Sequence, residues 1–181
     1  MLRRLIFKLV GMLVLHTKGR RGFAIFVGVT LGSNNRIYTT DWGSEPFLIT
    51  IGNFVTIANG VKFITHDGAA GLMKDQKGRR YYFNRITIGN NVFLGLDSII
   101  MPGVKIENNV IVAAGSVVTK SIPEGSIVAG VPAKIIGSFD ELKEKMLMQY
   151  ISEADMDFSI DFKSRITKVT STDYKPFLEK L

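Results

Sequence analysis

The sequence predicts a mainly β fold in which short strands wind into a parallel β-helix. Aliphatic residues recur every six positions between residues 88 and 118, and an aliphatic or small residue follows each of them four positions later. A period of six fits neither the 3.6 of an α-helix nor a simple array of hairpins. We therefore expect short strands separated by sharp corners, with the aliphatic residues stacked inside. The two sets are Ile88, Leu94, Ile100, Ile106, Val112 and Val118, and Val92, Ser98, Val104, Val110, Ser116 and Ile122.

The repeats occupy two stretches of the chain, with a break between them. Residues 31–67 and 86–135 supply about five coils, whereas residues 69–85 lack the pattern and are expected to form a loop. A stack of coils has two open ends whose unpaired backbone groups must be covered, and the two ends of the chain can do this. The stretch Ser138–Glu141 has the form of a capping box, and apolar residues at helical spacing follow it. This pattern predicts a helix over residues 139–152.

These features divide the chain into three parts. We expect a basic, apolar N-terminal segment over residues 1–22, a β-helix domain over residues 23–137 that carries the loop insertion, and a C-terminal helix and tail over residues 138–181. Beyond the predicted helix, residues 153–181 show no clear pattern and are expected to be irregular. A length of 181 residues fits one domain with appendages better than a two-domain enzyme.

Composition excludes several kinds of chemistry. With 46% hydrophobic and 22% charged residues, the chain has enough apolar side chains for a core, which excludes global disorder. The sequence contains no cysteine, so a disulfide framework, a thiolate metal site and a cysteine nucleophile are all excluded. His16 and His66 are the only histidines, and any proton transfer through imidazole must use one of them.

Positive charge is concentrated in two places. Residues 1–21 hold six of the 23 basic residues and no acidic residue, which leaves 17 basic and 16 acidic residues in the rest of the chain. A nearly neutral body argues against a nucleic-acid-binding face, so we expect no nucleic acid partner. The second concentration lies in the loop, where the basic residues either bind an anion or are simply exposed to solvent. It consists of Lys74, Lys77, Arg79, Arg80 and Arg85.

The N-terminal segment is apolar but too short to cross a membrane. Its apolar run from Leu5 to Leu15 is interrupted by Lys8 and falls well short of the roughly 20 residues that a spanning helix needs. The residues that follow do not resemble a signal-peptide cleavage site, so we expect the segment to be retained. As a helix flanked by basic residues, it either covers one end of the β-helix or makes a peripheral contact with an anionic membrane surface through residues 1–21.

Residues 51–67 and 86–137 resemble a known family. The later stretch contains VFLGLDSIIMPGVKIENNVIVAAGSVVTK and AGVPAK, and the earlier one is IGNFVTIANGVKFITHD. These motifs are similar to those of the hexapeptide-repeat O-acetyltransferases, in particular the polysaccharide and xenobiotic acetyltransferase branch. The stretch YTTDWGSEPFLI at residues 38–49 resembles the subgroup that acts on surface-polysaccharide sugars. The resemblance implies a left-handed parallel β-helix, acetyl-CoA as the acyl donor, and a homotrimer whose active sites lie between subunits.

The resemblance also implies a general base. Members of the family use a histidine of the β-helix for this task, and its match here is His66. An imidazole can take the proton of a hydroxyl group at physiological pH. The repeat fails at Asp67 and the loop follows, whereas His16 lies outside the repeats, and both observations favour His66. The alternative is a histidine that is hydrogen-bonded at a corner of a coil.

Five positions match the family's contacts with the acyl donor. The resemblance implies that the backbone N–H of Leu96 stabilises the tetrahedral oxyanion, in a direct transfer without an acyl-enzyme. The other matches are Ala114, Thr119, Lys120 and Lys134. Backbone groups at coil edges can pair with the amides of the pantetheine arm, and lysines can face its phosphates. The alternative for Lys120 and Lys134 is a pair of solvated corner residues, and Gly137 stands where the family often has an arginine.

Asp41, Trp42 and Glu45 are candidates for binding the acceptor, because they precede His66 by about one and a half coils. A tryptophan can stack on a sugar ring, and a carboxylate can accept hydroxyl protons or orient His66. The alternative is a tryptophan packed at a corner and two solvated acids. The loop 69–85, which contains Tyr81 and Tyr82, is expected to close the pocket.

The sequence therefore predicts an acyltransferase that moves an acetyl group from acetyl-CoA to a sugar hydroxyl, in surface or exopolysaccharide biosynthesis. The alternatives are a xenobiotic O-acetyltransferase and a non-catalytic β-helix scaffold. Zinc carbonic anhydrases share the prism but need three histidine ligands, which this chain lacks, so we expect no metal. We expect the protein in the cytoplasm, either free or at the inner face of the membrane.

Overall fold

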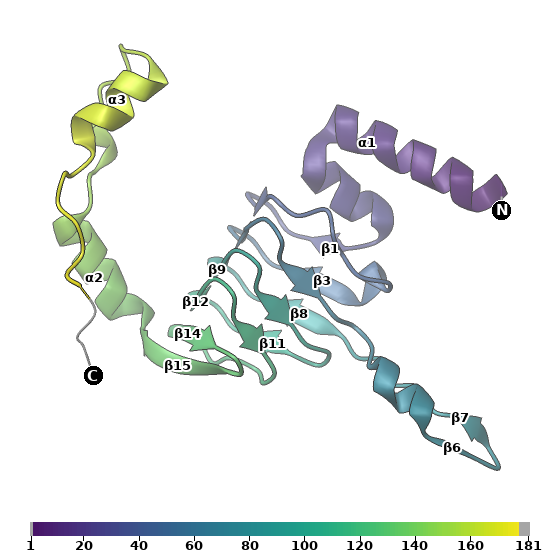
Figure 1. Ribbon diagram of the computed structural model, residues 1–181. Helices are drawn as coiled ribbons and strands as arrows, with labels where there is room; N and C mark the ends of the chain where they lie inside the picture. The colour runs from purple at the N-terminus through teal and green to yellow at the C-terminus, as the bar shows by residue number, and fades with distance from the viewer. Residues whose placement is uncertain (1, 178–181) are drawn as a thin grey trace. The chain divides into compact units, whose positions relative to one another are not determined.

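The structure is a computed structural model that describes residues 2–177. Its body is a prism with three faces, each a sheet made mainly of parallel strands (Figure 1). The chain divides into two compact units, a body that runs to Glu141 and a tail that begins at Leu142. The body contains all the residues that the sequence predicts for the active site. The predicted fold class, mainly β with a helical C-terminal part, is confirmed.

The three faces of the prism are built from very short strands. The first face holds, in spatial order, β1 (Thr30–Leu31), β3 (Ile49–Ile51), β8 (Ile86–Ile88) and β11 (Lys105–Ile106). The second holds β2 (Arg36–Ile37), β4 (Thr56–Ile57), β9 (Val92–Leu94), β12 (Val110–Val112), β14 (Ser126–Gly130) and β15 (Ala133–Ser138). The third holds β5 (Lys62–Phe63), β10 (Ile99–Ile100) and β13 (Val117–Val118). Within these three faces, neighbouring strands are parallel except β14 and β15, which form an antiparallel pair.

The register of these strands confirms the six-residue period. Residues that lie side by side in successive coils are 18 positions apart, so each coil has three sides of six residues. Examples are the pairs Ile88 with Ile106 and Leu94 with Val112. All twelve residues of the two predicted sets are buried, with no more than 4% of the surface of any of them exposed. The core of the body is therefore the stack of inward-pointing side chains that the sequence predicts.

The corner between the first and second faces depends on asparagine side chains. The side-chain oxygen of Asn90 accepts a hydrogen bond from the backbone N–H of Asn53 at 2.8 Å, and that of Asn108 accepts one from Asn90 at 2.8 Å. One residue later in each coil the backbone is left-handed, with φ between 54° and 56°. These positions are occupied by Asn34, Phe54, Asn91 and Asn109.

One helix covers the N-terminal end of the prism. The helix α1 (Leu2–Val27) is kinked at Gly19, where φ is 64° and ψ is −171°. After the kink, Ala24 is fully buried, and Phe23 and Val27 pack against the core. The backbone N–H of Val29 donates to the carbonyl of Ala24 at 3.0 Å and joins the helix to the first coil. The part of α1 after the kink therefore packs against the first coil of the prism. Within residues 2–177, no helix has the length and apolar character needed to cross a membrane.

The C-terminal helix is confirmed, but the tail is more ordered than the sequence suggested. The helix α2 (Phe139–Gln149) begins where predicted and ends three residues earlier. The expectation of an irregular tail is wrong for η3 (Glu153–Asp155) and α3 (Phe162–Val169). The start of α3 is stabilised by the carboxylate of Asp161, which accepts hydrogen bonds from the backbone of Lys163 and Ser164.

The break in the repeats forms an insertion at the corner between the third and first faces (Figure 1). It contains η2 (Gly68–Leu72) and a hairpin of β6 (Lys74–Asp75) and β7 (Gly78–Arg79). Ile51 and Ile88 pair across it although they are 37 positions apart, which is 19 more than one coil. The insertion therefore leaves the stacking of the coils intact.

Phe54 is the one residue of the corner column described above that is not asparagine, and it predicts a stabilising substitution. A bulky residue in the left-handed region is strained, whereas asparagine tolerates this conformation. We expect Phe54→Asn to raise the free energy of unfolding by about 0.5–1 kcal/mol in chemical denaturation. The matched control is Phe93→Asn in strand β9, where the backbone is extended and asparagine is disfavoured. A loss of stability in Phe54→Asn would show that the exposed ring contributes more than the strain costs.

Candidate active site

A glycine brings the segment before β3 against the third face of the prism. Gly43 has a φ of 67°, and a Cβ added there would lie 2.5 Å from the carbonyl oxygen of Phe63. Only glycine allows the backbone to approach β5 this closely. The neighbouring ring of Trp42 stacks on Phe63, with 5.3 Å between ring centroids and 10° between planes. On the other side of Gly43, Glu45 precedes η1 (Pro46–Leu48) and reaches the end of the third face.

Glu45 holds His66 in place through a hydrogen-bonded carboxylate. Nδ1 of His66 lies 2.9 Å from Oε2 of Glu45, and the hydroxyl of Thr65 donates to the same oxygen at 2.6 Å. Thr65 is 1% exposed, and the side chain of Glu45 is 18% exposed, whereas that of His66 is 40% exposed. The carboxylate is therefore held on its core side by the buried hydroxyl of Thr65, and the imidazole of His66 lies on its solvent side.

The surroundings of Glu45 favour its ionised form. Burial by itself would raise the pKa of this carboxyl group, but the hydrogen bonds from Thr65 and His66, together with the charge of His66, outweigh it. The net result is a pKa of Glu45 below its ordinary value of 4.5. At neutral pH the group is a carboxylate, which can only accept hydrogen bonds.

This carboxylate selects the tautomer of His66. Because Oε2 of Glu45 can only accept, Nδ1 of His66 must carry the hydrogen of the 2.9 Å bond. The neutral imidazole then has its lone pair on Nε2. A histidine in this state can take a proton through Nε2, and the nearby carboxylate stabilises the imidazolium that results.

His66 lies in a cleft at the base of the insertion. His66 forms an antiparallel bridge with Phe83, and the backbone N–H of Asp67 donates to the carbonyl of Tyr82 at 3.1 Å. The cleft has a volume of about 330 Å³. Its lining combines the two groups of the hydrogen-bonded pair with basic and aromatic side chains from the insertion: Ser44, Glu45, His66, Asp67, Arg79, Arg80, Tyr81, Tyr82 and Phe83. The tyrosines of the loop thus lie at the site, as the sequence suggested.

The basic residues of the loop are partly engaged with neighbours. Arg80 forms an ion pair with Asp75, and the guanidinium of Arg79 lies 5.1 Å from the ring centroid of Tyr81. Arg79 and Arg80 also line the cleft of His66. Of the two alternatives for this charge, the structure favours a positive border of the cleft at these two residues.

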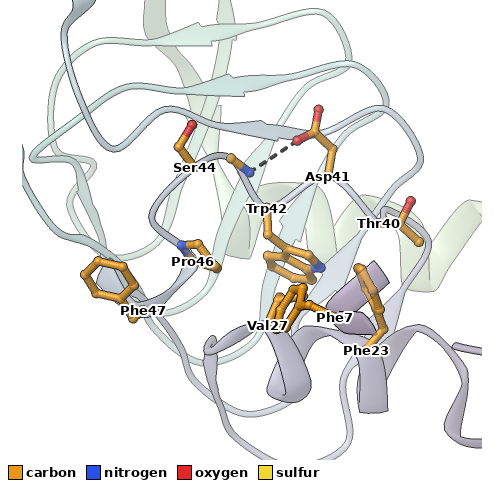
Figure 2. A pocket seen from close by; sticks show the side chains of 10 residues that line it. Phe7, Phe23, Val27, Thr40, Asp41, Trp42, Ser44, Pro46 and Phe47 are labelled. Atoms are coloured by element: carbon orange, nitrogen blue, oxygen red, sulfur yellow. Dashed lines mark hydrogen bonds between the residues drawn. The ribbon is translucent and has the colours of Figure 1, made fainter. Parts of the chain in front are cut away.

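The other two acceptor candidates lie apart from His66. Asp41 and Trp42 line a separate cavity of about 410 Å³ between α1 and the segment before β3, as Figure 2 shows. Trp42 is only 3% exposed and one face of its ring stacks on Phe63, so the ring is not open for stacking on a sugar. Asp41 accepts a hydrogen bond from the backbone N–H of Gly43 at 3.2 Å (Figure 2). The prediction of Trp42 as a sugar platform is therefore corrected to a core residue, and Glu45 alone joins His66.

Two of the predicted donor contacts lie at the corner between the second and third faces. The backbone N–H of Gly115 donates to the carbonyl of Leu96 at 2.8 Å, which stacks Ala114 beside Gly95 and Leu96. Leu96 and Ala114 are both exposed at this edge. Lys134, in β15, pairs with Ala129 one strand further along the same face. These three residues border one edge of the prism.

Thr119 and Lys120 lie at a different edge. They follow β13, at the corner between the third and first faces, and His66 follows β5 at the same corner. Two strand spacings of about 4.8 Å separate the rows of Thr119 and His66, or roughly 10 Å along the axis. The third face lies between this edge and the edge that carries Leu96. It is six or seven residues wide, and at about 3.3 Å per residue the two edges are roughly 20 Å apart. One protomer therefore does not bring His66 and Leu96 together.

Two features of the site were not identified from the sequence. Thr65 fixes Glu45, and Gly43 allows the approach of the segment that carries it. The signal for Thr65 was weak, because a single buried threonine inside a repeat resembles any small core residue. Gly43 follows a tryptophan and precedes a proline by three positions, and this local pattern marks a turn without revealing its partner. Among residues 2–177, no group of three side chains is arranged to hold a metal ion.

Comparisons with known proteins agree with the repeat. A family model described as the hexapeptide repeat of succinyl-transferase matches residues 85–120. CapG of Staphylococcus aureus is 46% identical over 124 residues, which cover 67% of this chain and 72% of that protein. The chain belongs to the hexapeptide-repeat acetyltransferase family. The galactoside O-acetyltransferase of Escherichia coli K12 is 38% identical over 54% of this chain, and the match spans about half of that relative, 47%.

Solved structures of the hexapeptide-repeat family share the fold. A galactoside acetyltransferase in complex with coenzyme A has a TM-score of 0.54 at 23% identity, covering 81% of this chain and 86% of that one. A maltose O-acetyltransferase from Clostridium difficile 630 has a TM-score of 0.53 at 24% identity, with coverages of 75% and 85%. At these identities the likeness supports the β-helix architecture alone.

The lowered pKa of Glu45 predicts a pH-dependent contribution to stability. A carboxyl group whose pKa is lower in the folded state stabilises the fold above its unfolded value of 4.5, and this contribution is lost as the pH falls through the folded value. The difference in unfolding free energy between the wild type and Glu45→Gln should therefore be largest near neutral pH and shrink below pH 4.5. Urea denaturation across this range measures it.

The control for this experiment is Glu144→Gln, which changes an exposed glutamate of α2. We expect its stability difference from the wild type to be close to zero throughout. A difference for Glu45→Gln that stays constant down to acidic pH would show that the ionised carboxylate does not stabilise the fold through Thr65 and His66.

Proposed function

We propose that the protein is an O-acetyltransferase that moves an acetyl group from acetyl-CoA to a hydroxyl group of a sugar, with His66 as the general base. The observation that carries the proposal is the hydrogen bond of 2.9 Å from Nδ1 of His66 to Glu45, at the wall of the cleft. This bond leaves Nε2 to accept a proton. The alternative of a histidine that is only hydrogen-bonded at a corner of a coil is tested by the substitutions below.

The relatives support the acceptor class. The relative from Escherichia coli K12 that is 38% identical is named a galactoside O-acetyltransferase. Another, 36% identical over 100 residues and covering 51% of each chain, is named for O-acetyl transfer in lipopolysaccharide biosynthesis. A sugar that is part of a surface polysaccharide or its precursor is therefore the acceptor that we favour. The polar lining of the cleft, with Ser44, Tyr82 and the arginines, suits a ligand with several hydroxyl groups.

The chemistry follows from the two groups of the pair. Nε2 of His66 removes the proton of the acceptor hydroxyl as its oxygen attacks the thioester carbonyl. The carbonyl oxygen gains negative charge, which the backbone N–H of Leu96 stabilises. The carbon–sulfur bond then breaks, and His66 returns its proton to the departing thiolate. Glu45 stays ionised throughout and compensates the positive charge on His66 between the two transfers.

The residues matched to the acyl donor have the properties that it needs. Leu96 and Ala114 present exposed backbone along one edge, where peptide groups can pair with the amides of the pantetheine arm. Lys120 and Lys134 are exposed cations that can approach its phosphates. No metal is needed for this transfer, because the general base and the backbone donor supply the proton transfer and the charge stabilisation.

The distribution of these residues over two edges supports a site shared between subunits. His66 lies at one edge of the third face and Leu96 at the other, roughly 20 Å away by the length of the strands between them. A thioester cannot contact both groups of one protomer. In a cyclic trimer, the edge of Leu96 in one protomer can face the edge of His66 in its neighbour. We therefore propose a homotrimer with three equivalent sites.

Substitution of His66 tests the base. We expect His66→Ala to lower the rate of thiol release from acetyl-CoA in the presence of galactosides by 10²- to 10⁴-fold, the usual contribution of a general base. Release of free thiol can be followed continuously with a chromogenic disulfide. The other histidine supplies the control, because His16 lies in the N-terminal helix, and His16→Ala should leave the rate unchanged.

Two results would oppose the assignment. If His66→Ala retained the wild-type rate at equal folding, His66 would not be the base. If none of a panel of sugars stimulated thiol release by the wild type, while small xenobiotic alcohols did, the sugar acceptor would be wrong and the transferase chemistry would stand.

A mixing experiment tests the shared site. We expect His66→Ala and Ala114→Trp each to be inactive as pure proteins, because one lacks the base and the other blocks the edge that receives the pantetheine arm. Mixed trimers refolded from equal amounts should regain up to about a quarter of the wild-type sites, since a site needs His66 from one chain and Ala114 from the next. The recovered activity is measured after purification of differently tagged mixtures.

The control for the mixing experiment is a mixture of His66→Ala with Glu45→Ala, whose changes lie on the same edge. No activity beyond that of the separate proteins should appear in it. If the test mixture formed mixed trimers but regained no activity, the two halves of the site would lie in one protomer.

A further inference from the structure

The kink at Gly19 separates the N-terminal helix into a part that covers the prism and an N-terminal arm, residues 2–18. One side of the arm packs against the part after the kink. The ring of Phe7 stacks on Phe26, with 4.8 Å between centroids, and Gly11 is buried beneath the rings of Phe23 and Phe26. A Cβ at Gly11 would lie 3.3 Å from each of these rings. The arm is therefore held in one orientation by aromatic contacts.

The opposite side of the arm exposes a continuous apolar face. Its residues follow the spacing of three and four positions that places side chains on one side of a helix. Each is at least 50% exposed, although all are large and apolar. We call these residues the outer face: Leu2 (71%), Leu5 (55%), Ile6 (50%), Leu9 (53%), Met12 (58%) and Leu13 (61%). Six neighbouring apolar side chains on one helix form a patch of the kind that marks an interaction surface.

The charge around the outer face indicates its partner. Arg3 and Lys8 are exposed and, by the helical spacing, lie along the two borders of the outer face, whereas Arg4 is exposed on the side of Gly11. Lys18 and Arg20 are exposed near the kink. The first acidic residue of the chain is Asp41, so nothing within the helix neutralises these cations. An apolar face with uncompensated positive charge complements a surface that offers both hydrocarbon and anionic groups. A second copy of the arm would instead bring like charges together.

We propose that the outer face of the arm lies in the interface of an anionic phospholipid bilayer. The arm does not cross the bilayer, because no described helix is long and apolar enough for that. Instead the leucines enter the boundary between headgroups and acyl chains, and the basic side chains extend to the lipid phosphates. This role is independent of the proposed acetyl transfer, which uses residues of the coils and of the segments between them, and none of the arm.

Flotation of the full-length protein with vesicles tests the proposal. We expect binding to vesicles with about one third phosphatidylglycerol in phosphatidylcholine to exceed binding to phosphatidylcholine alone by at least about tenfold, and to weaken as the salt concentration rises. Leu5→Gln combined with Leu9→Gln should reduce binding to the anionic vesicles by about tenfold or more. Arg3→Glu combined with Lys8→Glu should abolish the preference for anionic lipid.

A matched control keeps the experiment specific. Leu147→Gln combined with Met148→Gln changes two apolar residues of α2 that are 76% and 84% exposed, and binding should not change. Equal binding to neutral and anionic vesicles, or unchanged binding of both arm variants, would overturn the proposal. A drop in oligomer mass of the arm variants without vesicles, measured by light scattering, would assign the outer face to a second copy instead. All arm variants should keep the wild-type rate with a soluble sugar, so loss of membrane binding is distinguishable from loss of catalysis.

Discussion

The parallel pairing of strands 18 residues apart is the constraint on which the rest of the body depends. It places Ile88 on Ile106 and Leu94 on Val112, so that aliphatic side chains form continuous columns inside the prism. Burying one such side chain contributes about 1.5–3 kcal/mol, but a single coil has no neighbour to bury it against. The same ladder stacks the corners. Residues that are distant in the sequence therefore share an edge, and each edge can act as one wall of a binding site.

The insertion shows how the fold accommodates the cleft of His66 without losing its core. Ile51 and Ile88 pair as if no residues had been added, because the chain leaves the stack at His66 and returns at Phe83. The cost of closing a longer loop grows only slowly with its length. The prism thus supplies a rigid base for His66, while the added segment supplies the aromatic and basic wall of the cleft. The repeat is interrupted at the cleft that holds His66, so the break in the pattern marks the position of this cleft in the sequence.

The sequence was sufficient for features that repeat and insufficient for those that depend on a single contact. The six-residue period predicted the buried columns, because each position is tested again in every coil. Nothing similar distinguished Asp41 from Glu45, which are both acidic and precede His66 by 25 and 21 positions. Which of the two contacts His66 depends on the left-handed turn at Gly43, which places Trp42 in the core and Glu45 at the edge. In the tail, α3 was missed because one capping residue, Asp161, starts it and no repeat precedes it.

Glu45 connects the core of the prism to His66. The hydroxyl of Thr65 is buried and donates to the oxygen that also accepts from His66, so the packing of the third face fixes the position of the carboxylate before any ligand binds. The fixed carboxylate then fixes the imidazole. A solvated carboxylate such as that of Asp41 would have to be ordered at an entropic cost each time it met a histidine. A base that is oriented in advance needs little rearrangement when its charge changes, and this is the condition under which an electrostatic partner assists proton transfer.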